Sequence, residues 1–198
     1  MSRKANRVGT TVQRYWPAIA ALLFAFSFIV PLAFSGVARW RYNAALGASS
    51  RPSPWTRFTS PSGDFTVLLP EVAAETTQTV QHAEGPTTLR SVAAVAGPGA
   101  GYSVMVGEAP DDGENVTVRL DRLGADFVQR SKGKLLAQSV VSAGSVVGRE
   151  IRIASAEHSL RARLFVVNRH VYQVLVIRPP AADEDVLDER FLDSFTLP

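Results

Sequence analysis

Two kinds of hydrophobic pattern divide the chain. Residues 17–38 form a run of 22 residues without a charged side chain. A helix of this length spans about 33 Å, enough to cross the roughly 30 Å hydrocarbon core of a bilayer. From about residue 57 onward, apolar and polar residues mostly alternate with a period of two, and two stretches of helical period interrupt them. The pattern predicts one transmembrane helix followed by a domain of strands and helices.

Aromatic side chains bracket the apolar run, as expected of residues anchored at the two membrane interfaces. They are Tyr15 and Trp16 before the run, and Trp40 and Tyr42 after it. A cleavable signal peptide is the competing interpretation, because Ala18–Val30 is an apolar core and Ala33-Phe34-Ser35 resembles a cleavage site. The apolar stretch continues past Pro31, which favours a retained signal anchor over residues 16–40.

The distribution of charge predicts the topology of the anchor. The chain as a whole has a net charge of +3, but residues 1–51 contain cations and no acid, so the remainder is acidic. We expect a short cationic tail (1–15) to stay in the cytoplasm and to determine the orientation. Its cations are Arg3, Lys4, Arg7 and Arg14. Because the basic residues flank a membrane span, the expected partner is the lipid bilayer and not nucleic acid.

The rest of the chain is predicted to contain a linker and one folded domain. Residues 41–56 are rich in Ala, Ser and Pro, as in a spacer, and residues 57–198 are long enough for one domain with its own core. Strands are predicted over 65–69, 76–83, 87–96, 102–107, 135–142, 146–155, 159–167 and 171–178. Asn168-Arg169 has the spacing of a two-residue hairpin turn.

Two helices are predicted within the domain. Over 116–131, apolar residues recur on one helical face from Val116 to Phe127, with Asn115 as the N-cap and Gly133 as the stop. The second helix covers 183–194, with an acidic first turn and an apolar face that contains Phe191. Strands, helix, strands and helix in this order predict an α+β domain: an antiparallel sheet flanked by about two helices.

Short motifs of the domain resemble a known family. FTSPSGDFTV at 58–67, followed by Pro70, resembles the opening of PsbP-like domains. The segments 163–167, 171–174 and 191–195 resemble the closing hairpin and terminal helix of that family. The resemblance covers about residues 57–198. It implies an antiparallel sheet flanked by helices that acts in binding or assembly without catalysis.

Candidate chemistry is sparse. The chain has no Cys, and its three histidines, His82, His158 and His170, lack metal-binding spacing, so no cofactor or metal is expected. Gly144–Gly148 approximates a nucleophile elbow but precedes a strand, where an elbow should enter a helix. Acidic residues 111–114 and 183–185 are interpreted as turns and helix caps. No catalytic constellation is found, and the expectation is that the protein is not an enzyme.

Arginines on the later strands are the one charged pattern with two interpretations. They are Arg149, Arg152, Arg161, Arg163 and Arg169. Arg161 and Arg163 alternate with apolar residues, so one face of that strand is expected to meet the core and the other the solvent. The arginines either pair across strands with acids such as Glu150 and Glu157, or form a basic stripe that docks on an acidic partner or on lipid headgroups.

These observations predict a single-pass protein of the cytoplasmic membrane. Its PsbP-like domain is expected outside the cytoplasm, as a non-catalytic module that binds an unidentified envelope protein. Two alternatives stay open: an envelope hydrolase whose site is built from scattered loops, and a cleaved, soluble secreted binding domain.

Overall fold

The computed structural model describes residues 55–70, 73–82, 85–96, 100–109, 113–180 and 186–198. The predicted tail, the predicted transmembrane helix with its flanking aromatics, and nearly all of the predicted linker lie outside these residues. Within the described ranges, neither helix has the length and hydropathy that a membrane crossing requires.

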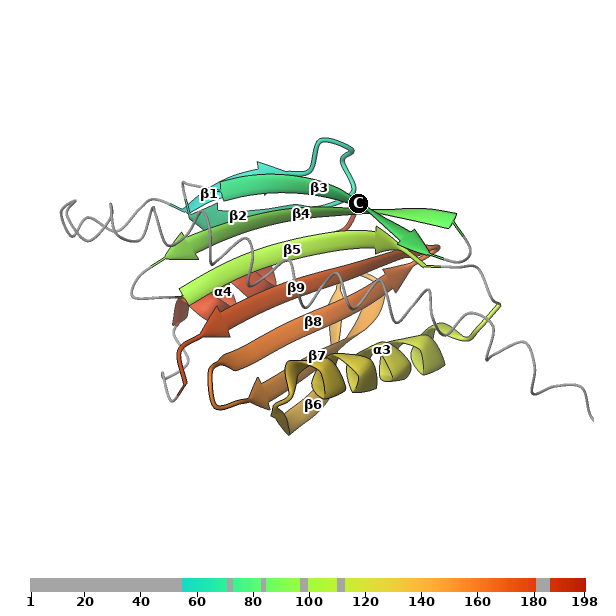
Figure 1. Cartoon of the computed structure of the whole chain (residues 1–198). Coiled ribbons are helices and arrows are strands. Elements are labelled where there is room, and N and C mark those ends of the chain that lie inside the picture. Colours follow the sequence, from blue (N-terminus) through green and yellow to red (C-terminus); the bar gives the residue numbers. More distant parts are fainter. Residues whose placement is uncertain (1–54, 71–72, 83–84, 97–99, 110–112, 181–185) are drawn as a thin grey trace, which may run out of the picture.

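A seven-stranded antiparallel sheet forms the body of the domain (Figure 1). Each predicted strand is present, with its ends shifted by at most three residues. In spatial order the strands are β3 (Ala73–His82), β4 (Gly85–Ala96), β5 (Ala100–Glu108), β9 (His170–Arg178), β8 (Ser159–Val167), β7 (Val146–Ala154) and β6 (Lys134–Ala143). The α+β prediction is therefore confirmed. β3 and β6 are the two edge strands.

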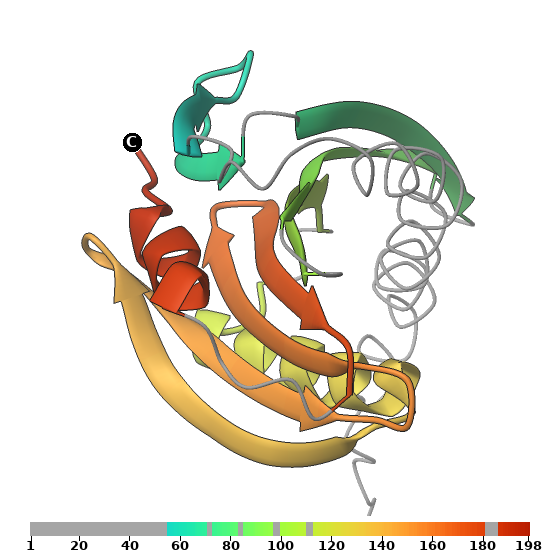
Figure 2. The same cartoon turned by 90° about the vertical axis from the view of Figure 1, so that its left-hand side faces the viewer.

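Each face of the sheet packs against different elements. α3 (Val116–Ser131) lies on one face, against β7 and β8. α4 (Val186–Ser194) lies on the other face, next to a two-stranded hairpin of β1 (Trp55–Thr59) and β2 (Thr66–Pro70). Figure 2 shows that the sheet is strongly curved, with α4 on its concave side.

The α3 helix begins as the sequence predicts but ends differently. Asn115 is the N-cap, and its side chain accepts a hydrogen bond from the Thr117 backbone amide at 2.8 Å. At the other end, Lys132 and not Gly133 adopts the left-handed conformation, with φ of 51°. Gly133 is required for a different reason: a Cβ there would lie 2.3 Å from Ile153 Cγ2. The glycine thus permits close packing of the helix end against β7.

The α4 side holds the aromatic part of the core. Phe191 and Phe195 of the C-terminal segment are buried against Tyr102, Phe165 and Phe65. The C-terminus also forms a bridge with β2, because Thr66 and Thr196 exchange backbone hydrogen bonds at 3.0 Å. The hairpin that opens the domain and the segment that closes the chain therefore stabilise each other.

The structure adds a strand that the sequence analysis did not predict. β1 begins at Trp55, two residues before the expected start of the domain. The Trp55 ring packs edge-on against Tyr102 with centroids 5.1 Å apart, and the Arg190 guanidinium lies 5.8 Å from its centre. These contacts come from distant parts of the chain, so the local sequence does not reveal them.

The motif at 58–67 forms the turn of the β1–β2 hairpin. The Ser60 hydroxyl accepts a hydrogen bond from the Asp64 amide at 2.8 Å, and Gly63 has φ of 74°. Asn168 likewise takes a positive φ of 53°, which confirms the predicted hairpin turn between β8 and β9. Both turns depend on residues that tolerate the left-handed region.

Candidate functional site

The strand arginines do not form an exposed stripe. Arg161 and Arg163 point toward α4, and the Arg161 residue is only 7% exposed. Both donate to Glu150 of β7, each through Nε at 2.8 Å. The cross-strand interpretation is confirmed for Glu150, whereas Glu157 lies near His158 instead. The expectation that one face of β8 meets solvent is wrong, because α4 and α3 cover opposite faces.

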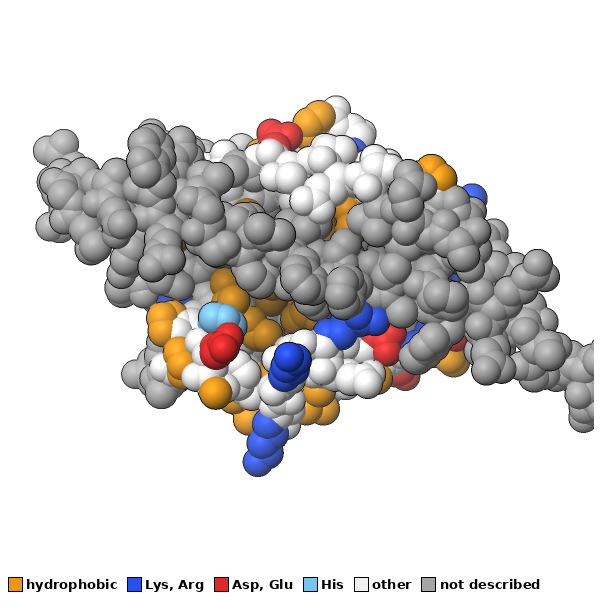
Figure 3. Space-filling model, viewed as in Figure 1, with side chains coloured by type: hydrophobic (Ala, Val, Ile, Leu, Met, Phe, Trp, Pro, Cys, Tyr) orange, Lys and Arg blue, Asp and Glu red, His pale blue; other side chains and the backbone are white. Residues whose placement is uncertain are grey.

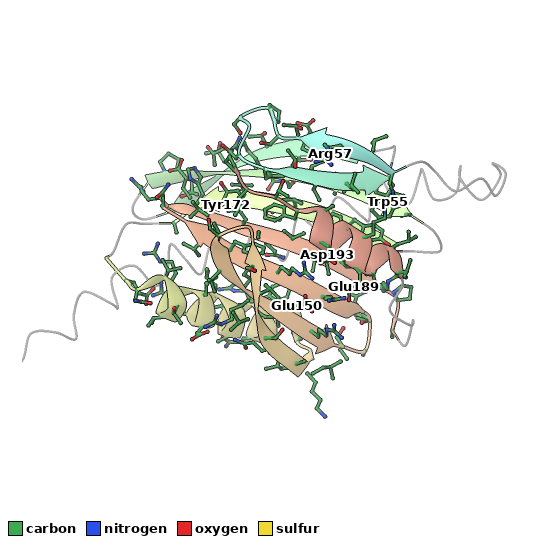
Figure 4. The ribbon with its side chains drawn as sticks, turned by 180° about the vertical axis from the view of Figure 1, so that it is seen from behind. Trp55, Arg57, Glu150, Tyr172, Glu189 and Asp193 are labelled. Atoms are coloured by element: carbon green, nitrogen blue, oxygen red, sulfur yellow. The ribbon has the colours of Figure 1, made fainter. Side chains whose placement is uncertain are left out.

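Two further acids come from α4. Glu189 accepts from Arg161 Nη1 at 2.6 Å, and Asp193 Oδ1 lies 2.8 Å from Arg163 Nη1. Figure 4 shows Glu189 and Asp193 on the helix beside Glu150 on the sheet. Burial by itself would raise the pKa of Glu150, but the hydrogen bonds from Arg161 and Arg163 outweigh it and lower the pKa to about 2. Glu150 is therefore an ionised structural centre that fixes α4 on the sheet.

A second buried polar group also attaches α4. Arg178 of β9 makes two hydrogen bonds to the carboxylate of Asp188, at 2.7 and 2.6 Å. The Tyr102 hydroxyl donates to the same carboxylate at 3.2 Å. Asp188 is 2% exposed, so these donors compensate for the cost of burying its charge. Like Glu150, Asp188 therefore has a structural role: its hydrogen bonds hold α4 against the sheet.

A third group of polar side chains lies beside a small pocket at the β1–β2 hairpin. The pocket has a volume of ≈ 190 Å³, and the hairpin supplies one wall while β3 and β4 supply the other. Phe58, Phe65 and Val92 line it with apolar surface, and Glu75, Thr77 and Arg90 add polar groups. Concave sites that combine apolar walls with a few oriented polar groups are typical of ligand binding.

Arg90 is held in place at this pocket. Its guanidinium donates to the Ser62 hydroxyl and to the Asp64 carboxylate, both in the β1–β2 turn. Ser62 in turn donates to Asp64 at 2.5 Å. The hydrogen bond from Ser62 lowers the pKa of Asp64, burial opposes this, and Arg90 lowers it further. Asp64 therefore stays ionised at neutral pH, and the Arg90 side chain beside it is still 37% exposed.

Three more titratable groups lie near Arg90 on the same face of the sheet. Tyr172 is buried, and its pKa is raised by burial and by the charge of Asp64. The His170 ring lies 6.3 Å from the Tyr172 ring, and its Nε2 is 4.0 Å from Glu108. His170 therefore lies near the charged pair of Arg90 and Asp64, although it is not among the residues that line the pocket.

The residues singled out from sequence are placed as follows. Tyr15, Trp16, Trp40, Tyr42 and the four tail cations lie outside the described residues. His158 lies in the turn between β7 and β8, His170 begins β9, and His82 ends β3. The three histidines therefore belong to different strands or turns. Across the ranges that the structure describes, no three His, Asp or Glu side chains are arranged to hold a metal ion. Gly144 is a turn glycine between two strands.

The sequence analysis missed Arg90 as a site residue. Its signal was present: Arg90 is the one charged side chain in a strand that otherwise contains apolar, small and hydroxyl residues. Its partners at 62 and 64 lie in a turn motif that was interpreted as structural. Separation by 26 residues hid the pairing until the hairpin was folded against β4.

Comparisons with known proteins yield a likeness of fold. Neither a family model nor a curated protein matches the chain. Among solved structures, the chain is similar to the solution structure of cyanobacterial PsbP (CyanoP) from Synechocystis sp. PCC 6803, with 13% sequence identity and a TM-score of 0.48. The match covers 77% of this chain and 96% of that one.

Proposed function

We propose that this protein is a single-pass membrane protein that presents a non-catalytic binding and assembly module in the cell envelope. The uncharged run at 17–38 anchors it in the cytoplasmic membrane, and the α+β domain lies on the extracytoplasmic side. Its partner is an envelope protein that contacts the pocket at the β1–β2 hairpin.

One observation carries this proposal: Arg90 is pre-oriented at the rim of a pocket with aromatic walls. The contacts to Ser62 and Asp64 fix the guanidinium, so little side-chain freedom remains to be lost on binding. Arginine beside aromatic surface is also the side-chain combination enriched at the centres of protein interfaces.

The same contacts favour binding over acid–base catalysis. A general base works best with a pKa near the working pH, whereas the pKa of Asp64 is lowered away from neutrality. Ser62 donates its hydrogen bond to this carboxylate and receives one from Arg90. Because the lowered pKa makes its carboxylate partner a weak base, the Ser62 hydroxyl is poorly activated as a nucleophile.

Binding is tested by photo-crosslinking in the cells of origin. A photo-reactive amino acid at Thr76, an exposed residue of the pocket wall, should form a defined adduct with one protein. The same probe at Thr79, exposed on the same strand but not part of the wall, is the matched control. Arg90→Ala should abolish the Thr76 adduct, and Arg90→Lys should weaken it, because lysine cannot make both contacts at once.

Equal adducts at positions 76 and 79, or an adduct indifferent to Arg90, would refute the pocket as the contact surface. Turnover of a chromogenic ester that depends on Ser62 would instead establish the hydrolase alternative. The wild type and the Arg90 variants should have the same near-ultraviolet circular dichroism, which checks that the domain remains folded.

Placement is tested separately by protease accessibility in intact spheroplasts. The domain should be digested from outside while a tag on the N-terminal tail stays protected. Protection of residues 57–198 would contradict the proposed topology. A mature N-terminus near Gly36 would support the cleaved, secreted alternative.

A further inference from the structure

β6 is an edge strand of the sheet, and most of its residues are exposed. Nine of its ten residues are exposed or partly exposed, and β7 is its neighbour on one side. Among the described strands, none pairs with its outer side. A free edge offers a row of unpaired backbone N–H and C=O groups to any other strand, and proteins usually protect such edges with charges, prolines or bulges.

β6 carries little of this protection. It contains one charged residue, Lys134, at its first position, and no proline. A register irregularity lies between Leu135 and Ala137, so it disturbs the beginning of the strand alone. From Ala137 to Ala143 the strand is regular and uncharged. The opposite edge differs, because β3 contains Glu75 and three threonines among its side chains.

Apolar side chains are exposed on this edge. Val140 is 66% exposed, more than Leu135 or Leu136 of the same strand. Its cross-strand neighbour Arg149 reaches Asp121 of α3, so Val140 faces the α3 side of the sheet. Val147 lies on the same face, two residues before Arg149 in β7, and is 52% exposed. Figure 3 shows described side chains of both signs on the α3 side of the molecule.

We propose that β6 is a homodimerisation edge, at which two copies of this chain pair antiparallel about a two-fold axis through Val140. The two seven-stranded sheets would then form one continuous sheet. A two-fold antiparallel pairing requires the axis to be perpendicular to the sheet, which places both α3 helices on the same face.

The sequence of the regular segment, AQSVVSA, is what identifies a second copy as the occupant. With Val140 opposite Val140 of the partner copy, small Ala137 meets Ala143, Gln138 meets Ser142, and Ser139 meets Val141. Valine meets valine at the centre, a pairing that favours cross-strand packing. The segment is therefore chemically close to symmetric about its middle. The Lys134 side chains of the two copies lie at opposite ends of the ladder, so they do not repel each other.

The absence of cysteine from the chain allows a direct test. In an antiparallel pair, directly opposite Cα atoms lie about 4.5–5.5 Å apart, a separation that a disulfide can bridge. The full-length chain with Val140→Cys, purified in detergent, should therefore form a disulfide-linked dimer under mild oxidation. Ser142→Cys should not, because its own symmetry mate lies about 13 Å away along the strand.

Thr79→Cys, exposed on the opposite edge strand, is the control for random collision. We expect Val140→Cys to crosslink at least about tenfold faster than either control, because only it has the required Cα separation. Equal rates for the three variants would overturn the proposal.

A second measurement separates the edge from any association through the N-terminal segment. Light scattering should give a dimer mass for the wild type and for Thr79→Lys, and a lower mass for Val140→Lys, because two lysines would face each other at the axis. Unchanged mass in Val140→Lys would refute β6 as the interface. A crosslink from Val140→Cys to a different protein, with a monomeric purified chain, would also refute a second copy as the occupant. None of these results depends on the pocket at Arg90.

Discussion

Glu150 and Arg161 form an ion pair that is almost completely buried. The Nε atom of Arg161 lies 2.8 Å from Oε1 of Glu150, and the two side chains are 8% and 6% exposed. In the register of β7 and β8, Glu150 stands directly opposite Arg163, and Arg161 is two residues away from that position. Arg163 donates to the second carboxylate oxygen of Glu150. A buried carboxylate with two arginine donors is far more sensitive to the loss of one partner than a surface pair would be.

The first prediction concerns acid stability. Glu150 ordinarily has a pKa of 4.5, lowered here to about 2. A lowered carboxyl pKa adds stability that is fully present above pH 4.5 and is lost as the pH falls toward 2. Glu150→Gln should lack this part of the pH dependence, which amounts to about 3 kcal/mol. Thermal unfolding of the full chain in detergent from pH 6 to pH 2 measures it.

Glu157→Gln is the matched control, because the Glu157 carboxylate is 85% exposed. Its unfolding temperature should follow the wild type across the same pH range. If Glu150→Gln also follows the wild type, the low pKa assigned to Glu150 is wrong.

The second prediction concerns the energetic coupling of the pair. Arg161→Leu leaves the Glu150 charge buried with one arginine fewer, and should lower the free energy of unfolding by about 3 kcal/mol. The double variant Glu150→Leu/Arg161→Leu removes both charges, so we expect it to be less destabilised than Arg161→Leu. Urea unfolding of the four proteins completes the double-mutant cycle. Additive losses would contradict the coupling.

The third prediction concerns the close approach of β7 and β8. A Cβ at Gly148 would lie 2.4 Å from the Leu164 carbonyl oxygen and 2.5 Å from the Phe165 ring. Gly148→Ala should therefore destabilise the domain by about 2–3 kcal/mol through overpacking. Ser142→Ala, at an exposed position of β6, should stay within about 0.5 kcal/mol of the wild type. Similar unfolding midpoints for the two variants would show that β7 can shift to make room.

The fourth prediction concerns the start of α3. Asn115→Ala removes the acceptor for the Thr117 amide and should cost about 1 kcal/mol of stability. Asn115→Ser retains a capping oxygen, so its denaturation midpoint should stay close to that of the wild type. A loss of equal size in both variants would mean that the amide group of Asn115 acts through contacts other than the cap.

Local pattern was sufficient to predict most elements of the domain. The period of apolar residues from Val116 to Phe127 predicts α3, and the structure has the helix over the same residues. Alternation predicts each strand of the seven-stranded sheet to within a few residues at either end. These elements are determined by short-range periodicity, which the tertiary structure reinforces and does not override.

The candidate site was much less predictable. Arg90 and Asp64 meet only because the β1–β2 hairpin folds against β4. From the sequence, Arg161 and Arg163 were expected to face the solvent. Alternation of apolar and polar residues predicts that a strand has two faces, but it does not predict which element covers each face. The α4 helix comes from the end of the chain, and its placement turns that face of β8 into an interior.

By itself, then, the sequence determined the order of strands and helices, the Asn115 cap and the Asn168 turn, because each depends on neighbours within a few residues. The tertiary structure alone decided that β1 begins at Trp55, that Glu150 is the centre of a buried charge cluster and that β6 is an edge strand of the described sheet. Pairing partners, burial and sheet order arise from contacts between residues far apart in the chain. Such contacts leave no periodic trace in the sequence.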